Sequence, residues 1–306
     1  MTQASRDNAG REHAADRLLA AIQRVGAPVC VGIDPVVQRL PAALSPAAGD
    51  ADACAAAIRS FSIEVLDAVA PHVACVKLQS ACFERYGVPG LEALQAVTGA
   101  ARDRGLQVVL DAKRGDIGVS AEHYAHAAFG GEAGMQPAPA DWLTINSYFG
   151  DDGIRPFLHA GRGAFALVRT SNPGGDRVQA ARLEDGRTVA QLVATMVAEV
   201  GAGSVGAAGY SALGAVVAAT RPDETAALRA LMPQQIFLVP GFGAQGGDAE
   251  SVRPCFARDG RGAIVTASRS VIYAFSPDQS DWTRAVGDAA AAFAEQIAKV
   301  ASGSQN

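Results

Sequence analysis

Four charged residues follow a short apolar run near the middle of the chain. The run comprises residues 106–110, and the charges after it are Asp111, Lys113, Arg114 and Asp116. A short β-branched apolar run is typical of a buried strand, and side chains two residues apart on a strand point the same way. We therefore expect Asp111 and Lys113 to lie together. Because buried charges are costly unless paired, and because α/β enzymes keep their chemistry at the carboxyl ends of strands, this stretch is the candidate catalytic centre.

The same charges have two simpler interpretations. They could be the polar start of a surface loop, which often follows a strand. Arg114-Gly115-Asp116 also spells the tripeptide of cell-adhesion ligands, but three residues carry little information and the chain shows no secretion signal. If the ends of the other predicted strands also carry polar residues, catalysis becomes the better interpretation.

Composition restricts the class of protein. Of the 306 residues, 49% are hydrophobic and 19% are charged, which is enough apolar material for a large buried core. The net charge of −5 gives no electrostatic footprint for nucleic acid. The five cysteines form no C-x-x-C pair, which favours reduced thiols in a cytoplasmic protein. Residues 1–10 lack the apolar core of a signal peptide, and no window reaches the ~18 apolar residues of a membrane span, so we expect no membrane association.

Apolar runs and helical patterns alternate along the whole chain. The predicted strands are residues 29–34, 72–78, 106–110, 141–146, 164–169, 214–220, 235–239 and 262–268. The predicted helices are residues 11–25, before the first strand, and then 52–70, 89–104, 120–129, 153–160, 188–200, 222–231, 248–256 and 281–300. Eight strands that alternate with eight helices predict a single (β/α)8 TIM barrel, an α/β fold, with an extra N-terminal helix. A doubly wound parallel sheet could produce the same alternation.

The limits of this domain follow from the same pattern. We expect residues 1–10 to be a disordered tail, 11–300 to form the catalytic barrel and 301–306 to be a flexible tail. The Gly- and Pro-rich segment 130–139 and the long polar loop 170–187 have no function that the sequence indicates.

Polar residues stand at the end of almost every predicted strand. They are Asp34, Lys77, Asp111, Lys113, Asn146, Arg169, Thr170, Ser171, Gln245 and Arg269. In a barrel all the strand ends open onto the same face, which is where the active sites of this fold lie. This convergence favours catalysis over the surface-loop interpretation.

A glycine-rich loop, residues 240–248, follows the seventh predicted strand. It contains a literal G-x-G-x-x-G, which could be a dinucleotide-binding fingerprint. That fingerprint normally opens its domain, however, and here the next strand ends without the acidic residue that would hold a ribose. Together with Ser268 and Arg269 after the eighth strand, the loop better fits the phosphate site of barrel enzymes. Its backbone amides can approach a phosphate closely, and Arg269 supplies a bidentate cation.

Several motifs in combination closely resemble those of one family, the orotidine 5′-phosphate decarboxylases in their longer bacterial-type subgroup. The motifs are GIDP at residues 32–35, VKLQ at 76–79, LDAKRGDIG at 110–118, RTSNPGG at 169–175, PGFGAQGGD at 240–248 and SRSVIYA at 268–274. The resemblance implies a barrel without metal or cofactor that converts orotidine 5′-monophosphate (OMP) to uridine 5′-monophosphate (UMP) and CO2, the last step of de novo pyrimidine synthesis. It also implies a homodimer with composite active sites, whose substrate is a small-molecule nucleotide and which has no nucleic-acid or membrane partner.

The resemblance assigns catalysis to four charged residues. They are Lys113, Asp111, Asp116 and Lys77. Lys113 would donate a proton to C6 of the pyrimidine, and the other three would complete an alternating array of charges around it. Asp116 would reach this array from the partner subunit.

The resemblance assigns substrate binding to a second set of residues. They are Asp34, Ile117, Ser120, Ser171, Gln245, Gly246, Ser268 and Arg269. Asp34, with Lys77, would hold the ribose hydroxyls, assisted by Ser120 of the partner subunit, and Ser171 would read the pyrimidine edge. Gln245 and Arg269 would bind the phosphate. Ile117 would line an apolar pocket beside the departing carboxylate.

The chemistry of this reaction suits such a cluster. Loss of CO2 leaves a carbanion at C6 that no π-system delocalises, so nearby positive charge is the main stabiliser. An ammonium group fixed by carboxylates needs no reorganisation when that charge appears, and it can deliver its proton to the same carbon. A carboxylate beside that of the substrate could also destabilise the ground state.

Three other functions fit parts of the pattern. One is a barrel enzyme that uses D-x-K-x-x-D with Mg2+ on a sugar phosphate, and another is a class I aldolase with Lys77 or Lys113 as the Schiff-base lysine. The third is a non-catalytic phosphate-binding or adhesion protein. The glycine-rich loop and the segment Ser171-Asn172-Pro173 favour a nucleotide as the ligand.

Overall fold

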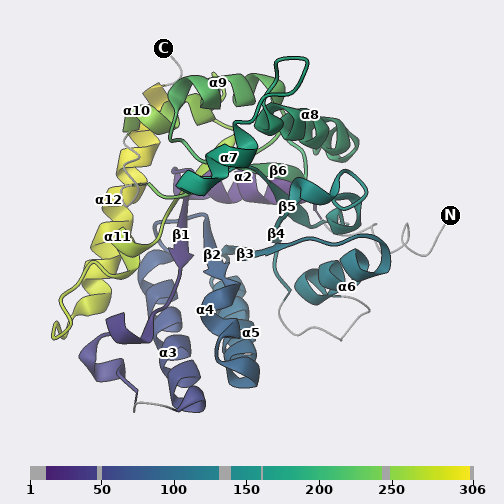
Figure 1. The fold of residues 1–306 in the computed structure, drawn as a ribbon. Coiled ribbons are helices and arrows are strands. Elements are labelled where there is room, and N and C mark those ends of the chain that lie inside the picture. The colour runs from purple at the N-terminus through teal and green to yellow at the C-terminus, as the bar shows by residue number, and fades with distance from the viewer. Residues whose placement is uncertain (1–11, 47–49, 131–138, 160, 243–248, 304–306) are drawn as a thin grey trace.

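The computed structural model describes residues 12–46, 50–130, 139–159, 161–242 and 249–303. Eight parallel strands close into a barrel in the order of the sequence, with helices around the outside (Figure 1). The strands are β1 (Val29–Ile33), β2 (Cys75–Gln79), β3 (Gln107–Arg114), β4 (Trp142–Ile145), β5 (Gly163–Arg169), β6 (Leu213–Val217), β7 (Phe237–Val239) and β8 (Ala263–Ala267). The barrel predicted from the sequence is therefore confirmed, and the doubly wound alternative is wrong.

The helices form the outer layer and also close one end of the barrel. They are α2 (Ala14–Val25), α3 (Ala51–Val69), α4 (Ser80–Glu84), α5 (Gly87–Asp103), α6 (Gly118–Phe129), α7 (Asp176–Gln179), α8 (Val189–Gly201), α9 (Pro222–Leu231), α10 (Ala249–Val252), α11 (Arg269–Ile272) and α12 (Trp282–Gly303). Among the described residues, none of these helices has the length and apolarity needed to cross a bilayer.

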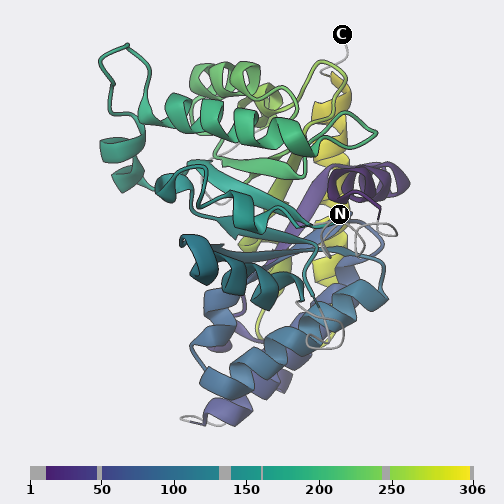
Figure 2. The same ribbon diagram turned by 90° about the vertical axis from the view of Figure 1, so that its right-hand side faces the viewer.

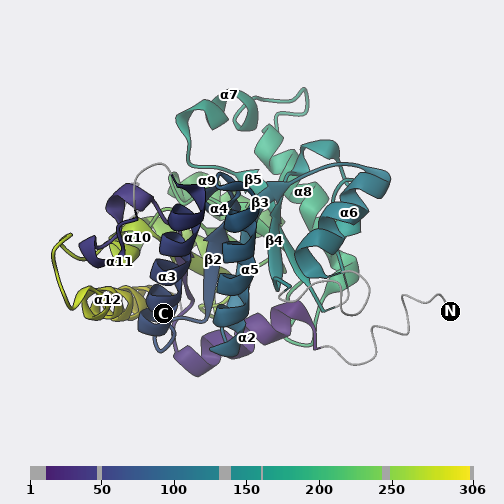
Figure 3. The same cartoon turned by 90° about the horizontal axis from the view of Figure 1, so that it is seen from below.

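The apolar side chains form two separate layers. One layer lies between the strands and the outer helices, and the other fills the inside of the barrel, where Trp142 stacks on Phe165 with ring centroids 4.6 Å apart. Ala14, Ala15 and Leu18 of α2 belong to the inner layer and are completely buried. The helix α2 therefore closes the amino end of the barrel. Figure 3 shows α2 and α7 at opposite ends of the strands.

The carboxyl end of α12 lies beside α2. Ala298 and Ala301 of α12 and Leu19 of α2 line the same hollow, and the two helices are seen next to each other in Figure 2. The last helix continues to Gly303, three residues beyond the expected end of the barrel domain at residue 300. One reason is that the guanidinium of Arg253 donates to the Gly303 carbonyl at 3.0 Å. The expected tails at residues 1–10 and 304–306 and most of the segment 130–139 lie outside the described residues.

Several boundaries differ from the predicted ones. The strand predicted for residues 106–110 continues to Arg114, through the charged residues. The helix predicted for residues 248–256 ends at Val252 and becomes a 3-10 turn, because Pro254 has no N–H to continue an α-helix. The helix predicted for 153–160 is only the 3-10 turn Arg155–Phe157. The loop predicted for 170–187 contains α7.

A buried aspartate joins elements at the amino end of the barrel. Asp141 is 5% exposed, and its carboxylate accepts hydrogen bonds from Arg17 of α2 at 3.1 Å, Arg102 of α5 at 3.4 Å and Arg162 at 3.1 Å. It also accepts one from the backbone N–H of Val108 at 3.0 Å. One carboxylate therefore ties α2, α5 and the start of two strands together.

Replacing this carboxylate should destabilise the fold. We expect Asp141→Asn to lower the free energy of unfolding by about 3 kcal/mol, because the substitution leaves the buried guanidinium of Arg162 and the partly buried one of Arg17 without their counter-charge. Urea unfolding measures the loss. The matched control is Glu295→Gln, which removes an exposed carboxylate that pairs with Lys299 on α12 and should leave the transition unchanged. Equal effects of the two substitutions would contradict the role given to Asp141.

Candidate active site

Three strands bring a cluster of opposite charges to the carboxyl rim of the barrel. The ammonium group of Lys77 on β2 lies 2.8 Å from Asp111 Oδ2 and 3.6 Å from Asp34 Oδ1, just after β1. The ammonium group of Lys113 lies 2.6 Å from the other oxygen, Asp111 Oδ1. Asp111 and Lys113 therefore lie together, as the strand spacing predicted. Lys77 and Asp111 are buried, whereas the Lys113 side chain is 46% exposed and accessible to a ligand.

The backbone at Lys113 is distorted. In the part of the chain that the structure describes, Lys113 is the only residue other than glycine with a positive φ, at +47°. The pairing with β4 shifts at the same place, because Leu110 pairs with Leu143 and Arg114 with Ile145. A bulge of this kind re-aims side chains and is frequent next to active sites, and a positive φ is a strained conformation for lysine.

The charges of the cluster shift the pKa values of Asp111 and Lys77. Burial by itself raises the pKa of Asp111, but the ammonium groups of Lys77 and Lys113 outweigh that effect and lower this pKa to about 2. Burial by itself lowers the pKa of Lys77, and here the carboxylates of Asp34 and Asp111 outweigh it and raise the pKa. Near neutral pH the carboxylate of Asp111 therefore stands between two ammonium groups.

A cavity of about 410 Å³ opens directly above the cluster. Its polar lining comprises Lys77, Asp111, Lys113, Thr144, Thr170, Ser171, Asn172 and Thr266, and its apolar lining comprises Leu167, Val216, Leu238 and Pro240. An apolar wall with a few convergent polar and charged groups is the usual composition of a small-molecule site. The cavity joins the ends of seven strands, β2 to β8, including β5, whose end precedes Ser171.

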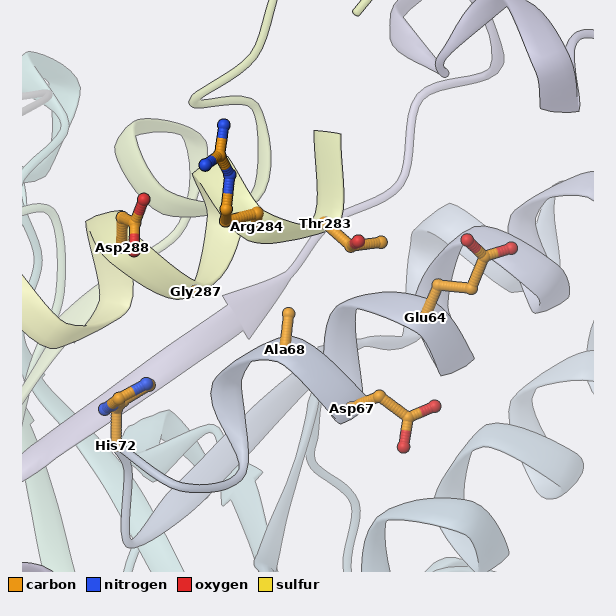
Figure 4. Close-up of a pocket in the computed structure, with 8 residues that line it drawn as sticks. All are labelled: Glu64, Asp67, Ala68, His72, Thr283, Arg284, Gly287 and Asp288. Carbon is orange, nitrogen blue, oxygen red and sulfur yellow. The ribbon is translucent and has the colours of Figure 1, made fainter. Parts of the chain in front are cut away.

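A second hollow, on the outside of the barrel between α3 and α12, lacks these features. It measures about 430 Å³, and its lining includes Glu64, Asp67, His72, Arg284 and Asp288. Figure 4 shows the side chains of Glu64 and Asp67 directed away from Asp288, so they do not converge on one point. Within the described ranges, no three His, Cys, Asp or Glu side chains gather to form a possible metal site. The cavity above Lys113 is therefore the candidate active site.

The segment after Lys113 does not reach its own cluster. Asp116 accepts a hydrogen bond from the backbone N–H of Ile117 at 2.8 Å and, among the described residues, forms no ion pair with Lys113. Ile117 is 55% exposed, and Ser120 is exposed as well. None of these three predicted site residues belongs to the lining of the cavity.

The predicted phosphate site is only partly described. Ser268 precedes α11 and lies close to β1, because a Cβ atom added to Gly32 would lie 2.0 Å from the Ser268 hydroxyl. Glycine at position 32 thus makes room for Ser268 near Asp34. Arg269 is the first residue of α11 and is exposed. The predicted phosphate ligands Gln245 and Gly246 lie outside the described residues.

Arg169 was expected at the functional face, but its guanidinium is buried away from the cavity. It is 3% exposed and donates to Glu224 of α9 at 2.9 Å, to Gln179 at 3.0 Å and to Asp176. Asp176 also binds Arg221. Arg169 therefore anchors α7, at the end of the loop that carries Ser171, and its charge is already neutralised by protein groups.

Sequence reasoning missed three residues that position the cluster. The hydroxyl of Thr144 donates to Asp111 Oδ1 at 2.8 Å, and Gln79, with its amide nitrogen turned toward Asp111, donates to Oδ2 at 2.8 Å. The hydroxyl of Tyr273 accepts from the Val36 backbone at 2.7 Å and donates to the Asp34 carbonyl at 3.2 Å. Gln79 and Tyr273 lie within the quoted motifs, but Thr144 had no local signal beyond its place in a strand.

The lowered pKa of Asp111 has a consequence for stability. Because the pKa is lower in the folded chain than in the unfolded one, ionised Asp111 stabilises the fold above pH ~4 and this contribution is lost as the pH falls toward 2. Lys77 has the opposite sign, so its contribution is present below its unfolded pKa and is lost only in strong alkali. We expect the difference in unfolding free energy between wild type and Asp111→Asn to grow by about 2 kcal/mol from about pH 2 to about pH 5. Urea unfolding at several pH values measures it, and a constant difference would contradict the ion pairing.

Comparisons with known proteins agree with this geometry. Residues 27–280 match the sequence profile of the orotidine 5′-phosphate decarboxylase / HUMPS family. The chain is 42% identical over 297 residues to an orotidine 5′-phosphate decarboxylase of Rhodopirellula baltica, covering 92% of this chain and 98% of the relative. It is 44% identical over 225 residues to that of Deinococcus radiodurans, covering 72% and 78%. The structure of Leishmania donovani OMP decarboxylase superposes with a TM-score of 0.74 at 29% identity, covering 94% of this chain and 98% of the other. The chain therefore belongs to the orotidine 5′-phosphate decarboxylase / HUMPS family.

Proposed function

We propose that the protein is an orotidine 5′-phosphate decarboxylase that converts OMP to UMP and CO2 in de novo pyrimidine synthesis, in the cytoplasm. The observation that carries this proposal is the position of the Lys113 ammonium group, 2.6 Å from the buried carboxylate of Asp111. This ammonium group lines a cavity whose other walls are partly apolar and partly polar, as binding of a nucleotide requires. Membership of the family supports the same reaction.

The proposed mechanism needs only groups of the protein. The bond between C6 and the substrate carboxylate breaks, CO2 leaves and the electron pair stays on C6. The fixed ammonium of Lys113 stabilises this carbanion electrostatically and then transfers a proton from Nζ to C6, which gives UMP. Because Asp111 already neutralises and orients Lys113, little reorganisation is required when the negative charge appears. We therefore propose catalysis without metal or cofactor.

We propose that polar residues at the carboxyl ends of the strands bind the substrate. Asp34 and Lys77 hold the ribose hydroxyls, and Ser171 reads the pyrimidine edge. Ser268 and Arg269, together with Gln245 and Gly246, bind the phosphate. The position of Ser268 beside Gly32 supports this assignment, because it places the start of α11 next to the end of β1.

We also propose a homodimer in which each site contains residues of both subunits. The support is an exposed apolar patch next to the cavity, to which Ile117 (55% exposed), Val119 (66%), Tyr148 (85%) and Phe149 (44%) contribute. Phe149 packs close to Gly115, so the two segments form one surface. Exposed apolar surface of this kind is typical of protein–protein contacts. In such a dimer, Asp116 and Ser120 of the partner subunit complete the site, and Ile117 lines the pocket for the departing carboxylate.

The raised pKa of Lys77 weighs against the aldolase alternative. A Schiff base requires a neutral amine, whereas Asp34 and Asp111 keep Lys77 protonated despite its burial. Lys113 also pairs with Asp111. A decarboxylation that uses the protonated lysine is therefore favoured over a reaction in which a neutral lysine amine attacks a carbonyl group. The Mg2+-dependent alternative predicts that a chelator abolishes activity, whereas the proposed reaction should continue in its presence.

The test of the function is an ultraviolet assay for loss of OMP with the wild type and with Lys113→Ala. The wild type should turn over OMP at the same rate with and without EDTA. Lys113→Ala should lose more than about 10⁴-fold in kcat, because the substitution removes both the stabilising charge and the proton donor. UMP should still bind to this variant in calorimetry, because the phosphate and ribose contacts remain.

The matched control is Lys299→Ala, which removes an exposed lysine of α12 and should leave turnover unchanged. If the wild type fails to consume OMP, the proposed function is wrong. Loss of activity in EDTA would support the Mg2+-dependent alternative.

The composite site makes a separate prediction. Lys113→Ala and Asp116→Ala chains, each inactive alone, should regain about a quarter of wild-type activity after unfolding and refolding as an equal mixture. Half of the dimers are then mixed, and each mixed dimer contains one intact site of two. Each variant refolded alone is the control. Absence of rescue would indicate that Asp116 acts within its own subunit.

A further inference from the structure

The bulge in β3 leaves one residue of β4 opposite three residues. Leu110 pairs with Leu143 and Arg114 pairs with Ile145, so residues 111–113 face Thr144 alone. A bulge removes regular ladder partners from the residues inside it. A buried backbone N–H without a partner is costly, so the N–H of Lys113 needs another acceptor.

Thr144 supplies that acceptor with its side chain. Its Oγ1 accepts from the backbone N–H of Lys113 at 3.0 Å and donates its proton to Asp111 Oδ1 at 2.8 Å. Thr144 is 1% exposed, so water does not compete for these bonds. One hydroxyl thus connects the carboxylate of Asp111 to the strained backbone at Lys113.

We propose that Thr144 is a positioning residue for the reaction: its hydroxyl holds the bulge at Lys113 and the Asp111 carboxylate in the single arrangement that aims the Lys113 ammonium at C6. This inference rests on the proposed function. Thr144 acts through Asp111 and Lys113, because its single hydroxyl proton goes to the carboxylate of Asp111 and its oxygen accepts from the N–H of Lys113.

The chemistry of the side chain explains why a hydroxyl is required. A hydroxyl on Cβ both donates to the carboxylate and accepts from the N–H, whereas an isosteric valine can do neither. A carboxylate that lacks one hydrogen bond retains its ion pairs but gains freedom to rotate. The ammonium group of Lys113 then spends part of the time in orientations from which it cannot transfer a proton to C6. We therefore expect kcat to fall more than the affinity for the nucleotide.

The experiment compares Thr144→Val with Thr144→Ser in the full-length protein. We expect Thr144→Val to lower kcat for OMP by about 10- to 100-fold, the effect of removing a hydrogen bond to a charged group, while KM and the Kd of UMP change by less than about twofold. Thr144→Ser keeps the hydroxyl and should restore most of kcat. A purely structural role would instead weaken UMP binding and thermal stability in parallel with kcat.

The matched control is Thr98→Val. Thr98 is also a buried threonine whose hydroxyl bonds to a carbonyl, that of Leu94 at 2.8 Å, but it lies in α5 away from the cavity. It should leave kcat unchanged. Wild-type kcat in Thr144→Val, or failure of Thr144→Ser to recover activity, would overturn the inference while leaving the proposed function intact.

A crystal structure of Thr144→Val decides the question even if OMP is not the substrate. The inference expects a change in the φ of Lys113 or a Lys113–Asp111 contact longer than the 2.6 Å of the wild type. An unchanged bulge and an unchanged contact would show that Thr144 positions nothing.

Discussion

The carboxylate of Asp111 holds an ammonium group on each of its oxygens, at 2.8 Å for Lys77 and 2.6 Å for Lys113, and the site depends on this arrangement. Removing charges from water costs several kcal/mol per ion, and only close pairing with further hydrogen bonds compensates for it. Here Thr144 supplies a further bond to the same carboxylate. The cost is met during folding, so the charges are already oriented when a substrate arrives.

The contacts that stabilise the barrel and the charged cluster of the candidate active site lie at opposite ends of the strands. At the amino end, α2 seals the interior and Asp141 binds three guanidinium groups. Below the cavity, the stacked rings of Trp142 and Phe165 fill the interior. The carboxyl end can therefore carry strain, such as the positive φ of Lys113, because rigid strands on every side oppose its relaxation.

Residues outside the lining of the cavity also shape the rim. Arg169 uses its guanidinium to hold α7, and Tyr273 fixes the backbone on both sides of Pro35 by binding Asp34 and Val36. Arg39 stacks over the Tyr273 ring, 4.0 Å from its centroid. Supporting residues of this kind fix the position of the loops around a site relative to its charged side chains.

Local patterns in the sequence predict the alternation of strands and helices and the place of the charged residues on them, because apolar runs, helical periodicity and the two-residue repeat of a strand depend only on neighbouring residues. They therefore predict that Asp111 and Lys113 share a face. The hydrogen-bond partners of these two residues outside the charge cluster depend on how distant strands and helices pack. The register of β4 against the bulged β3 selects Thr144 as the partner, and the approach of α7 and α9 turns Arg169 from a candidate ligand into an anchor. Those contacts join residues as far as 55 positions apart in the chain, and no local pattern encodes the distance between such residues.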